Sequence, residues 1–330
     1  MQRGRLPGNP HLLQAAGQTS NWAISHWSET QPPSLPARKA RSWRMVSIVW
    51  LLLAANCLWP LATSPPRRIV STAPSITEIL FALGLGDRVV GVTVYCRYPP
   101  AAQRLPKIGT YTTPNLEAIL RLRPDLVIVQ ENPVRLRERM ERVGLRVLEL
   151  PHTTLDDLFT SIQLVATAAG VPARGAQVVQ SLKRELTEIE QRTQPLPRRR
   201  VVFVVSRLPS ALEQIRVVGG SSYLNRLLEI AGGENVFRDV TSPYPQVSLE
   251  TLMAKDPEVI LDATVMGSSS TSKEATLEST RKLWSRLRQL AAVRRNAIFA
   301  LESELFVVPG PRVTLAARAL ARMLHPELIW

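Results

Sequence analysis

The sequence predicts an α/β protein with two lobes, each built on a mostly parallel sheet, joined by one long helix. Short β-branched runs alternate with amphipathic segments along most of the chain, which is typical of a parallel sheet covered by helices on both faces. One segment, residues 172–192, is longer than the others and carries apolar residues at helical spacing. A composition of 45% hydrophobic and 21% charged residues excludes wholesale disorder and a polytopic membrane protein.

The first half of the chain alternates strands and helices from residue 68 onward. Short buried strands are expected at residues 68–71, 89–94, 126–129 and 147–150. Helices are expected at residues 75–83, 115–122, 134–143 and 154–169. A glycine directly follows three of these helices, as is common at a helix C-terminus.

The second half repeats this alternation after a long helix. Residues 172–192 predict a stiff helix between two domains, because a flexible linker would be rich in glycine and serine. Strands are expected at residues 201–205, 259–261 and 297–301, and helices at 222–231, 249–254 and 313–324. A Gly/Ser-rich stretch at 267–272 is expected to be a mobile loop. The predicted organisation is a leader at 1–66, lobes at 67–171 and 198–330, and a connecting helix at 172–197.

The N-terminal segment has the composition of a leader. Residues 1–68 contain eight basic residues and one acidic residue, so they carry +7 of the chain's net charge of +14. Within this stretch, residues 38–62 run from basic through apolar to small residues, the order of a secretory signal. The apolar run is shorter than the roughly 20 residues that span a bilayer. We therefore expect a periplasmic or extracytoplasmic protein, with lipidation at Cys57, an uncleaved anchor and a later translation start left open.

The residues that usually carry catalysis form no recognisable enzyme motif. The sequence contains no P-loop, no zinc-ligand spacing and no H-E-x-x-H pattern, and no metal or cofactor is expected. Cys96 and His152 could form a thiol–imidazole pair, which leaves a Cys96-dependent enzyme as an alternative. Arginines at 135–142 alternate with glutamates, as on a solvated helix face, so nucleic-acid binding is not expected.

The tyrosines indicate a ligand-binding cleft more clearly. Four of the five lie in Pro- or Thr-rich loops beside predicted strands: Tyr95, Tyr98, Tyr111 and Tyr244. Loops at the carboxyl ends of strands form the ligand crevice of open α/β sheets. A tyrosine offers a flat apolar face and one polar tip. Local packing of each ring against a proline is the alternative, but rings in both halves favour a cleft for a large flat molecule.

Seven short motifs follow one another along residues 67–328. They lie at residues 69–78, 91–100, 108–117, 123–127, 232–237, 244–250 and 309–312. With these motifs the chain resembles the periplasmic binding proteins of ABC importers for cobalamin and iron chelates, and among them most the members that bind cobalamin. The resemblance implies two Rossmann-like lobes on a rigid helical backbone, with a corrinoid bound between them and only small lobe movement on binding. It also implies a monomer that is not an enzyme and that delivers its ligand to a permease.

The resemblance also implies roles for particular residues. Ligand contacts are expected at Tyr95, Cys96, Arg97, Tyr98, Tyr111, Tyr244 and Glu304. Glu117 and Glu250, one in each lobe, match carboxylates that dock onto arginines of the permease, although solvated first-turn glutamates are the simpler interpretation.

Three positions depart from the family pattern. Gln130 replaces a cleft aromatic residue, Val308 replaces a basic residue, and Arg97 stands where an acid is usual. These changes leave a siderophore or haem open as the ligand, and Arg97 in particular favours a more anionic one. A sensor or chaperone built on the same fold is a further alternative.

Overall fold

The computed structural model describes residues 64–131, 135–265 and 273–328. The predicted signal segment and Cys57 therefore lie outside the described residues, as does the predicted loop at 267–272. Within the part of the chain that is described, no helix is both long enough and apolar enough to cross a membrane.

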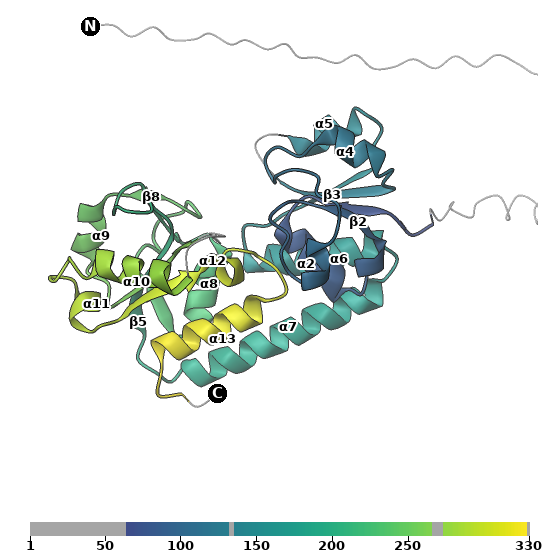
Figure 1. The fold of residues 1–330 in the computed structure, drawn as a ribbon. Coiled ribbons are helices and arrows are strands. Elements are labelled where there is room, and N and C mark those ends of the chain that lie inside the picture. The colour runs from purple at the N-terminus through teal and green to yellow at the C-terminus, as the bar shows by residue number, and fades with distance from the viewer. Residues whose placement is uncertain (1–63, 132–134, 266–272, 329–330) are drawn as a thin grey trace, which may run out of the picture. The chain divides into compact units, whose positions relative to one another are not determined.

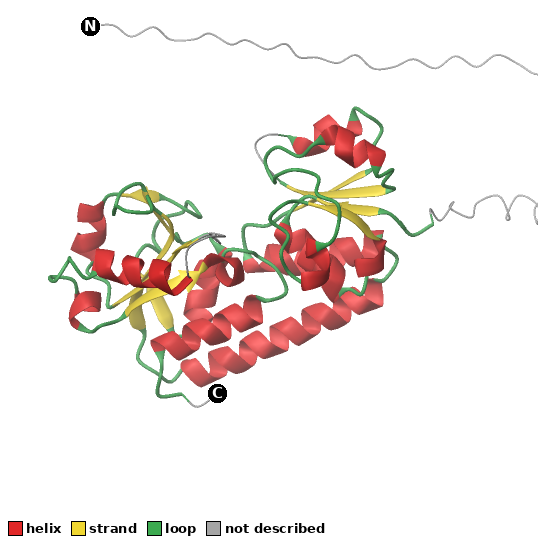
Figure 2. Cartoon of the chain, in the orientation of Figure 1, coloured by secondary structure: helices red, strands yellow, loops and turns green. Residues whose placement is uncertain are grey.

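The first lobe is built on a four-stranded sheet in which every pairing is parallel (Figures 1 and 2). Its strands, in the order β2-β1-β3-β4, are β1 (Ile69–Ser71), β2 (Val89–Val92), β3 (Leu126–Gln130) and β4 (Val147–Leu150). The helical segments of this lobe are α2 (Pro74–Ala82), η2 (Gly86–Arg88), α3 (Pro100–Gln103), α4 (Leu116–Arg121), α5 (Leu136–Glu141) and α6 (Leu155–Ala168).

Helices cover both faces of this sheet, as the sequence predicts. Ile69 and Ile128 face α2 and α6 within one buried cluster, while Val70 and Val127 belong to another cluster with residues of α4 and α5. Figure 1 shows α4 and α5 on one side of the strands and α2 and α6 on the other. The run of fully buried residues in β1 and β3 follows from this two-sided cover.

The predicted connecting helix is α7 (Pro172–Thr193), which has 22 residues. Its buried side chains include Val179, Leu182, Leu186 and Ile189, which recur at helical spacing. Through this stripe α7 contacts α6 of the first lobe and both α8 (Tyr223–Ile230) and α13 (Val313–Leu324) of the second. The domain limits at residues 171 and 198 stay a prediction.

The second lobe has a mixed sheet in which parallel pairings outnumber antiparallel ones, in agreement with the expected mostly parallel sheet. Its strands, in the order β10-β9-β5-β6-β8 with β7 beside β5, are β5 (Arg199–Ser206), β6 (Ile215–Val217), β7 (Gly233–Asn235), β8 (Gln246–Val247), β9 (Val259–Val265) and β10 (Ile298–Glu302). The pairings of β5 with β7 and β9, and of β9 with β10, are parallel, whereas β6 and β8 are antiparallel additions. The loop from β5 to β6 is too short for a crossover helix, so β6 returns antiparallel.

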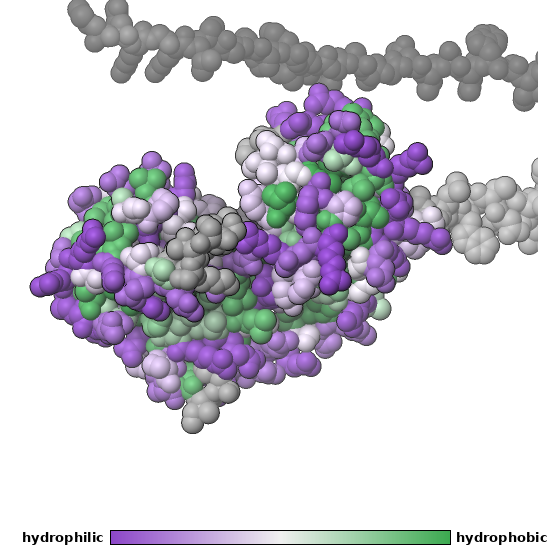
Figure 3. Space-filling view, viewed as in Figure 1, coloured by the Kyte–Doolittle hydropathy of each residue, from purple (hydrophilic) through white to green (hydrophobic). Residues whose placement is uncertain are grey.

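Four further helices complete the second lobe. They are α9 (Leu249–Lys255), α10 (Lys273–Trp284), α11 (Ala291–Arg294) and α12 (Ser303–Phe306). The sequence analysis predicts no helix at α10, whose polar residues outnumber its apolar ones. Trp284 at its end is nevertheless fully buried against Ile260 and Val202 of the sheet. Hydrophilic residues dominate the visible face of the molecule (Figure 3), as expected when the apolar side chains fill the lobe cores.

Candidate ligand-binding site

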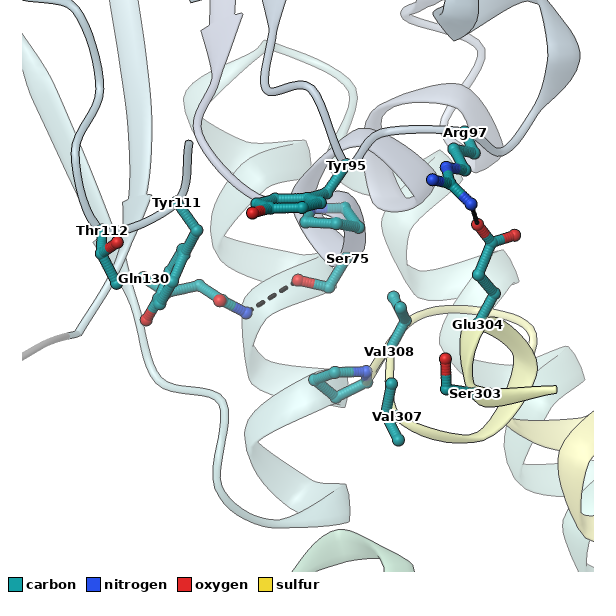
Figure 4. Close-up of a pocket in the computed structure, with 12 residues that line it drawn as sticks. Ser75, Tyr95, Arg97, Tyr111, Thr112, Gln130, Ser303, Glu304, Val307 and Val308 are labelled. Carbon is teal, nitrogen blue, oxygen red and sulfur yellow. Dashed lines mark hydrogen bonds and ion pairs between the residues drawn. The ribbon is translucent and has the colours of Figure 1, made fainter. Parts of the chain in front are cut away.

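A cavity of about 510 Å³ is lined by residues of both lobes (Figure 4). The first lobe contributes Pro74, Ser75, Tyr95, Arg97, Tyr111, Thr112 and Gln130, and the second lobe contributes Ser303, Glu304, Val307, Val308 and Pro309. Pro74 and Ser75 lie at the start of α2, and Tyr95 and Arg97 lie in the loop after β2. Tyr111 and Thr112 lie in the loop before α4, and Gln130 is the last residue of β3. The position agrees with the rule that ligands bind beyond the carboxyl ends of parallel strands.

Two tyrosine rings project into this cavity. Figure 4 shows Tyr95 and Tyr111 on neighbouring loops with both rings turned toward the open space. Tyr95 is 46% exposed, whereas Tyr111 packs against the core, and burial raises the pKa of its hydroxyl. An apolar ligand could therefore lie against the cavity-facing side of each ring without first displacing a buried contact.

The loop that carries Tyr111 depends on a glycine. Gly109 has a φ of +96°, and a Cβ at this position would lie 2.8 Å from the backbone oxygen of Thr113. The backbone of Thr113 donates to the hydroxyl of Thr110 at 3.0 Å, which closes the turn around Tyr111. Only glycine accepts this combination of backbone angle and close approach. The local sequence therefore determines the turn that carries Tyr111.

Gln130 supplies a polar group to the cavity wall at the end of β3. It is 8% exposed, and its Nε2 donates to Ser75 Oγ at 2.7 Å. This bond joins β3 to the first turn of α2, as the dashed line in Figure 4 shows. Gln130, one of the three positions that depart from the family pattern, is therefore part of the lining.

An ion pair connects the two lobes at the cavity. Arg97 Nη1 lies 3.1 Å from Glu304 Oε1, with side chains 46% and 45% exposed (Figure 4). Pairs with this exposure are worth about 0–1 kcal/mol, because water competes for both charges. A ligand with an anionic group could therefore pair with Arg97 in place of Glu304 at a small cost in free energy.

Cys96 does not contact the cavity, which corrects the expectation for this residue. It is 1% exposed, and its Sγ lies 3.1 Å from both Thr77 Oγ1 and Thr93 Oγ1. The chain turns inward at Cys96 between two outward residues, so its thiol packs in the first-lobe core. A buried thiol in this setting is a structural residue and a poor candidate for nucleophilic chemistry.

The other two tyrosines lie outside the cavity lining. Tyr98 is 44% exposed, and its ring lies under the guanidinium of Arg312, whose Cζ is 4.2 Å from the ring centroid. Tyr244 packs partly against the core, where burial raises the pKa of its hydroxyl although a hydrogen bond with Ser222 acts the other way. The structure thus brings together two of the four tyrosines.

The two expected docking carboxylates are on the surface of different lobes. Glu117 lies in the first turn of α4, with its side chain 78% exposed and 3.8 Å from Arg121. Glu250 lies in the first turn of α9, where hydrogen bonds from its own backbone and from Ser248 lower the pKa of its carboxyl. Neither lines the cavity of Figure 4. Their part in docking stays a prediction.

Several lining residues are absent from the sequence-based expectation. They are Pro74, Ser75, Thr112, Ser303, Val307 and Pro309. Pro74, Ser75 and Pro309 belong to motifs that carry the family resemblance, so a signal for them was present. Across residues 64–131, 135–265 and 273–328, no group of three or more His, Cys, Asp or Glu side chains could hold a metal ion.

The chain belongs to the periplasmic binding protein family, whose model matches residues 69–305. The family consists of substrate-binding transport proteins rather than enzymes. Membership implies a periplasmic location, a small-molecule ligand and an ABC permease as partner.

Similar proteins with a stated ligand include vitamin B12-binding and heme-binding proteins. A vitamin B12-binding protein of Vibrio parahaemolyticus is 31% identical over 255 residues, which cover 76% of this chain and 87% of the relative. The structure of the periplasmic vitamin B12 binding protein BtuF of Vibrio cholerae matches with a TM-score of 0.67 and 28% identity, over 80% of this chain and 98% of that one. A periplasmic heme binding protein from Pseudomonas aeruginosa matches with a TM-score of 0.69 and 26% identity, over 80% and 94%. The two-lobed α/β fold is thereby confirmed.

Proposed function

We propose that this protein captures a corrinoid, such as cobalamin, between its two lobes and delivers it to the permease of an ABC importer. The observation that carries the proposal is the cavity lined from both lobes, with Tyr95 and Tyr111 on one side and Val307 and Val308 on the other. Such a site offers a corrin ring two apolar walls and few polar contacts, as ligand pockets generally do. Relatives named as vitamin B12-binding proteins support the choice of ligand.

The size of the cavity suits partial enclosure of this ligand. About 510 Å³ is within the range of pockets that enclose drug-sized molecules, roughly 300–1,000 Å³. A corrinoid with its nucleotide loop is larger than such a molecule. We therefore expect its ring system to enter the cavity and its side groups to extend toward solvent.

Haem is the second candidate, and Arg97 is the observation that favours it. Arg97 lines the cavity and has an exposed partner in Glu304, so it could pair with a propionate instead. Proteins named as heme-binding have the same fold. An Arg97→Asp variant distinguishes the two ligands. Loss of the cation should lower the affinity for an anionic ligand more than the affinity for a neutral one.

Calorimetry with cyanocobalamin, cobinamide, haemin and a ferric siderophore tests the ligand directly. We expect the tightest binding with cyanocobalamin or cobinamide. Tyr95→Ala and Tyr111→Ala should each weaken that binding, by roughly 1–2 kcal/mol, because each removes a ring face from the cavity wall. Leu120→Ala is the control, because Leu120 is an exposed apolar residue of α4 that lies outside the lining. Binding of haemin alone would transfer the proposal to the haem alternative, and binding of none would refute it.

A further inference from the structure

Arg312 of the second lobe reaches across to the first lobe beside the cavity. Arg312 is the residue directly before α13, and its Nε donates to Glu78 Oε1 of α2 at 3.0 Å. Its Nη2 donates to the same carboxylate oxygen. The two partners are separated by 234 positions in the sequence, so this contact joins the lobes directly.

The same guanidinium makes two more contacts. Its Cζ lies over the ring of Tyr98, 4.2 Å from the centroid, and its Nη2 donates to the backbone oxygen of Glu304 at 3.3 Å. Arg312 thus holds α2 and the Tyr98 loop of the first lobe while it is anchored to α12 of its own lobe. An arginine serves here because its planar fork donates in several directions and its face stacks on a ring.

The Glu78–Arg312 contact is much better shielded from water than the Arg97–Glu304 pair. The side chains of Glu78 and Arg312 are 3% and 17% exposed, whereas those of Arg97 and Glu304 are 46% and 45% exposed. Removing one member of a buried pair leaves an uncompensated charge, while an exposed pair opens at little cost. The Glu78–Arg312 pair is therefore the lasting connection, and the Arg97–Glu304 pair can open to admit a ligand.

The chain around Arg312 is shaped for this contact. A Cβ on Gly310 would lie 2.6 Å from Glu78 Oε2, which is buried and has no hydrogen-bond partner among the described residues. Glycine therefore allows the segment to lie directly on the carboxylate. Pro309 lines the cavity beside Gly310, and Ser75 lines it one helical turn before Glu78. The pair accordingly lies directly behind both walls of the cavity.

We infer that Arg312 is a positioning residue of the ligand site, which sets the spacing of the two cavity walls by holding Glu78 of one lobe and Glu304 of the other. The inference rests on the proposed function for its effect on ligand binding. Its effect on the cavity walls is independent of which ligand binds.

An Arg312→Lys variant of the full chain tests this role, with Arg322→Lys, at an exposed position within α13, as the matched control. Lysine keeps the charge opposite Glu78 but lacks the fork and the planar face that reach Glu304 and Tyr98. We expect faster backbone hydrogen exchange at residues 303–310, unchanged protection of β5 and β9, and about tenfold weaker binding of whichever of cyanocobalamin and haemin the wild type binds. The control should match the wild type in both measurements.

Gly310→Ala provides a second, independent variant. Its added methyl group must displace the Glu78 carboxylate, so it should reproduce the Arg312→Lys pattern while Arg312 itself is retained. Three results for Arg312→Lys would each overturn the positioning role. They are unchanged hydrogen exchange at residues 303–310, unchanged ligand affinity, and a uniform rise in hydrogen exchange through both lobes. If the wild type binds neither probe, the proposed function fails, and the exchange pattern alone then decides on Arg312.

Discussion

At the scale of single residues, the second lobe contains a fully buried ion pair between Arg207 and Asp262. Asp262 of β9 is fully buried, and its Oδ2 accepts hydrogen bonds from Arg207 Nε at 2.7 Å and Trp284 Nε1 at 2.6 Å. Arg207 also donates to Thr280 Oγ1 at 3.2 Å. These bonds tie the end of β5 to β9 and α10, and they offset the cost of burying the two charges.

Arg207→Ala should therefore destabilise the protein strongly. Without its partner the Asp262 carboxylate remains buried and unpaired, so we expect the free energy of unfolding to fall by about 3–5 kcal/mol. Urea denaturation measures the change, with the exposed Arg146→Ala as control. Adding Asp262→Asn to Arg207→Ala should restore part of the loss, since it removes the unpaired charge. A loss no larger than that of the control would contradict this view of the pair.

At the scale of elements, helix α6 shows how a local signal starts a helix that other elements need. The hydroxyl of Thr154 accepts from the Asp157 backbone at 3.1 Å, and the Asp157 carboxylate accepts from the Thr154 backbone at 2.8 Å. This capping box satisfies two backbone groups that the first turn leaves without helical partners. The helix then packs against α7, so a local cap supports the contact between the first lobe and the connecting helix.

Thr154→Ala should lower the free energy of unfolding by about 1 kcal/mol, because it removes one side of the capping box. Thr154→Ser keeps a hydroxyl at the cap and should lie close to the wild type. Thr167→Ala, at an exposed position of the same helix, controls for the change of threonine itself. Chemical denaturation compares the three variants, and equal values for Thr154→Ala and Thr167→Ala would rule out the cap as a source of stability.

At the scale of the whole molecule, the proposed delivery step requires both lobes. Glu117 and Glu250 lie on α4 and α9, one in each lobe, and both are exposed (Figure 1). Neither carboxylate lines the ligand cavity. We propose that docking onto the permease uses both of them, which separates delivery from capture.

The Glu117→Ala/Glu250→Ala double variant should abolish uptake of the ligand into cells and leave its affinity unchanged. Two charges lost at the docking face remove attraction to basic residues of a partner, without touching the cavity. The matched control is Glu138→Ala/Glu274→Ala, which removes one exposed carboxylate from each lobe elsewhere. Transport assays and calorimetry on the same variants test whether delivery and capture use different residues. Normal uptake or a loss of ligand affinity in the double variant would refute this separation.

The fold could be predicted to a large extent because its signals are local. Helix α13 has the predicted limits of residues 313–324, and strands β1, β3 and β4 lie within one or two residues of expectation. The antiparallel strand β6 has no such signal, because its direction follows from the length of the loop before it. Helix α10 was missed because a polar helix held by one buried tryptophan has little periodicity.

The amino-acid sequence by itself determined the alternation of strands and helices, the long connecting helix and the family resemblance, since each depends on residues close together in the chain. The tertiary structure decided which tyrosines reach the cavity and that Cys96 turns into the core. It also decided the pairing of Arg97 with Glu304 and of Arg312 with Glu78, across 207 and 234 positions. Contacts over such separations arise only when the lobes come together, so no local pattern encodes them.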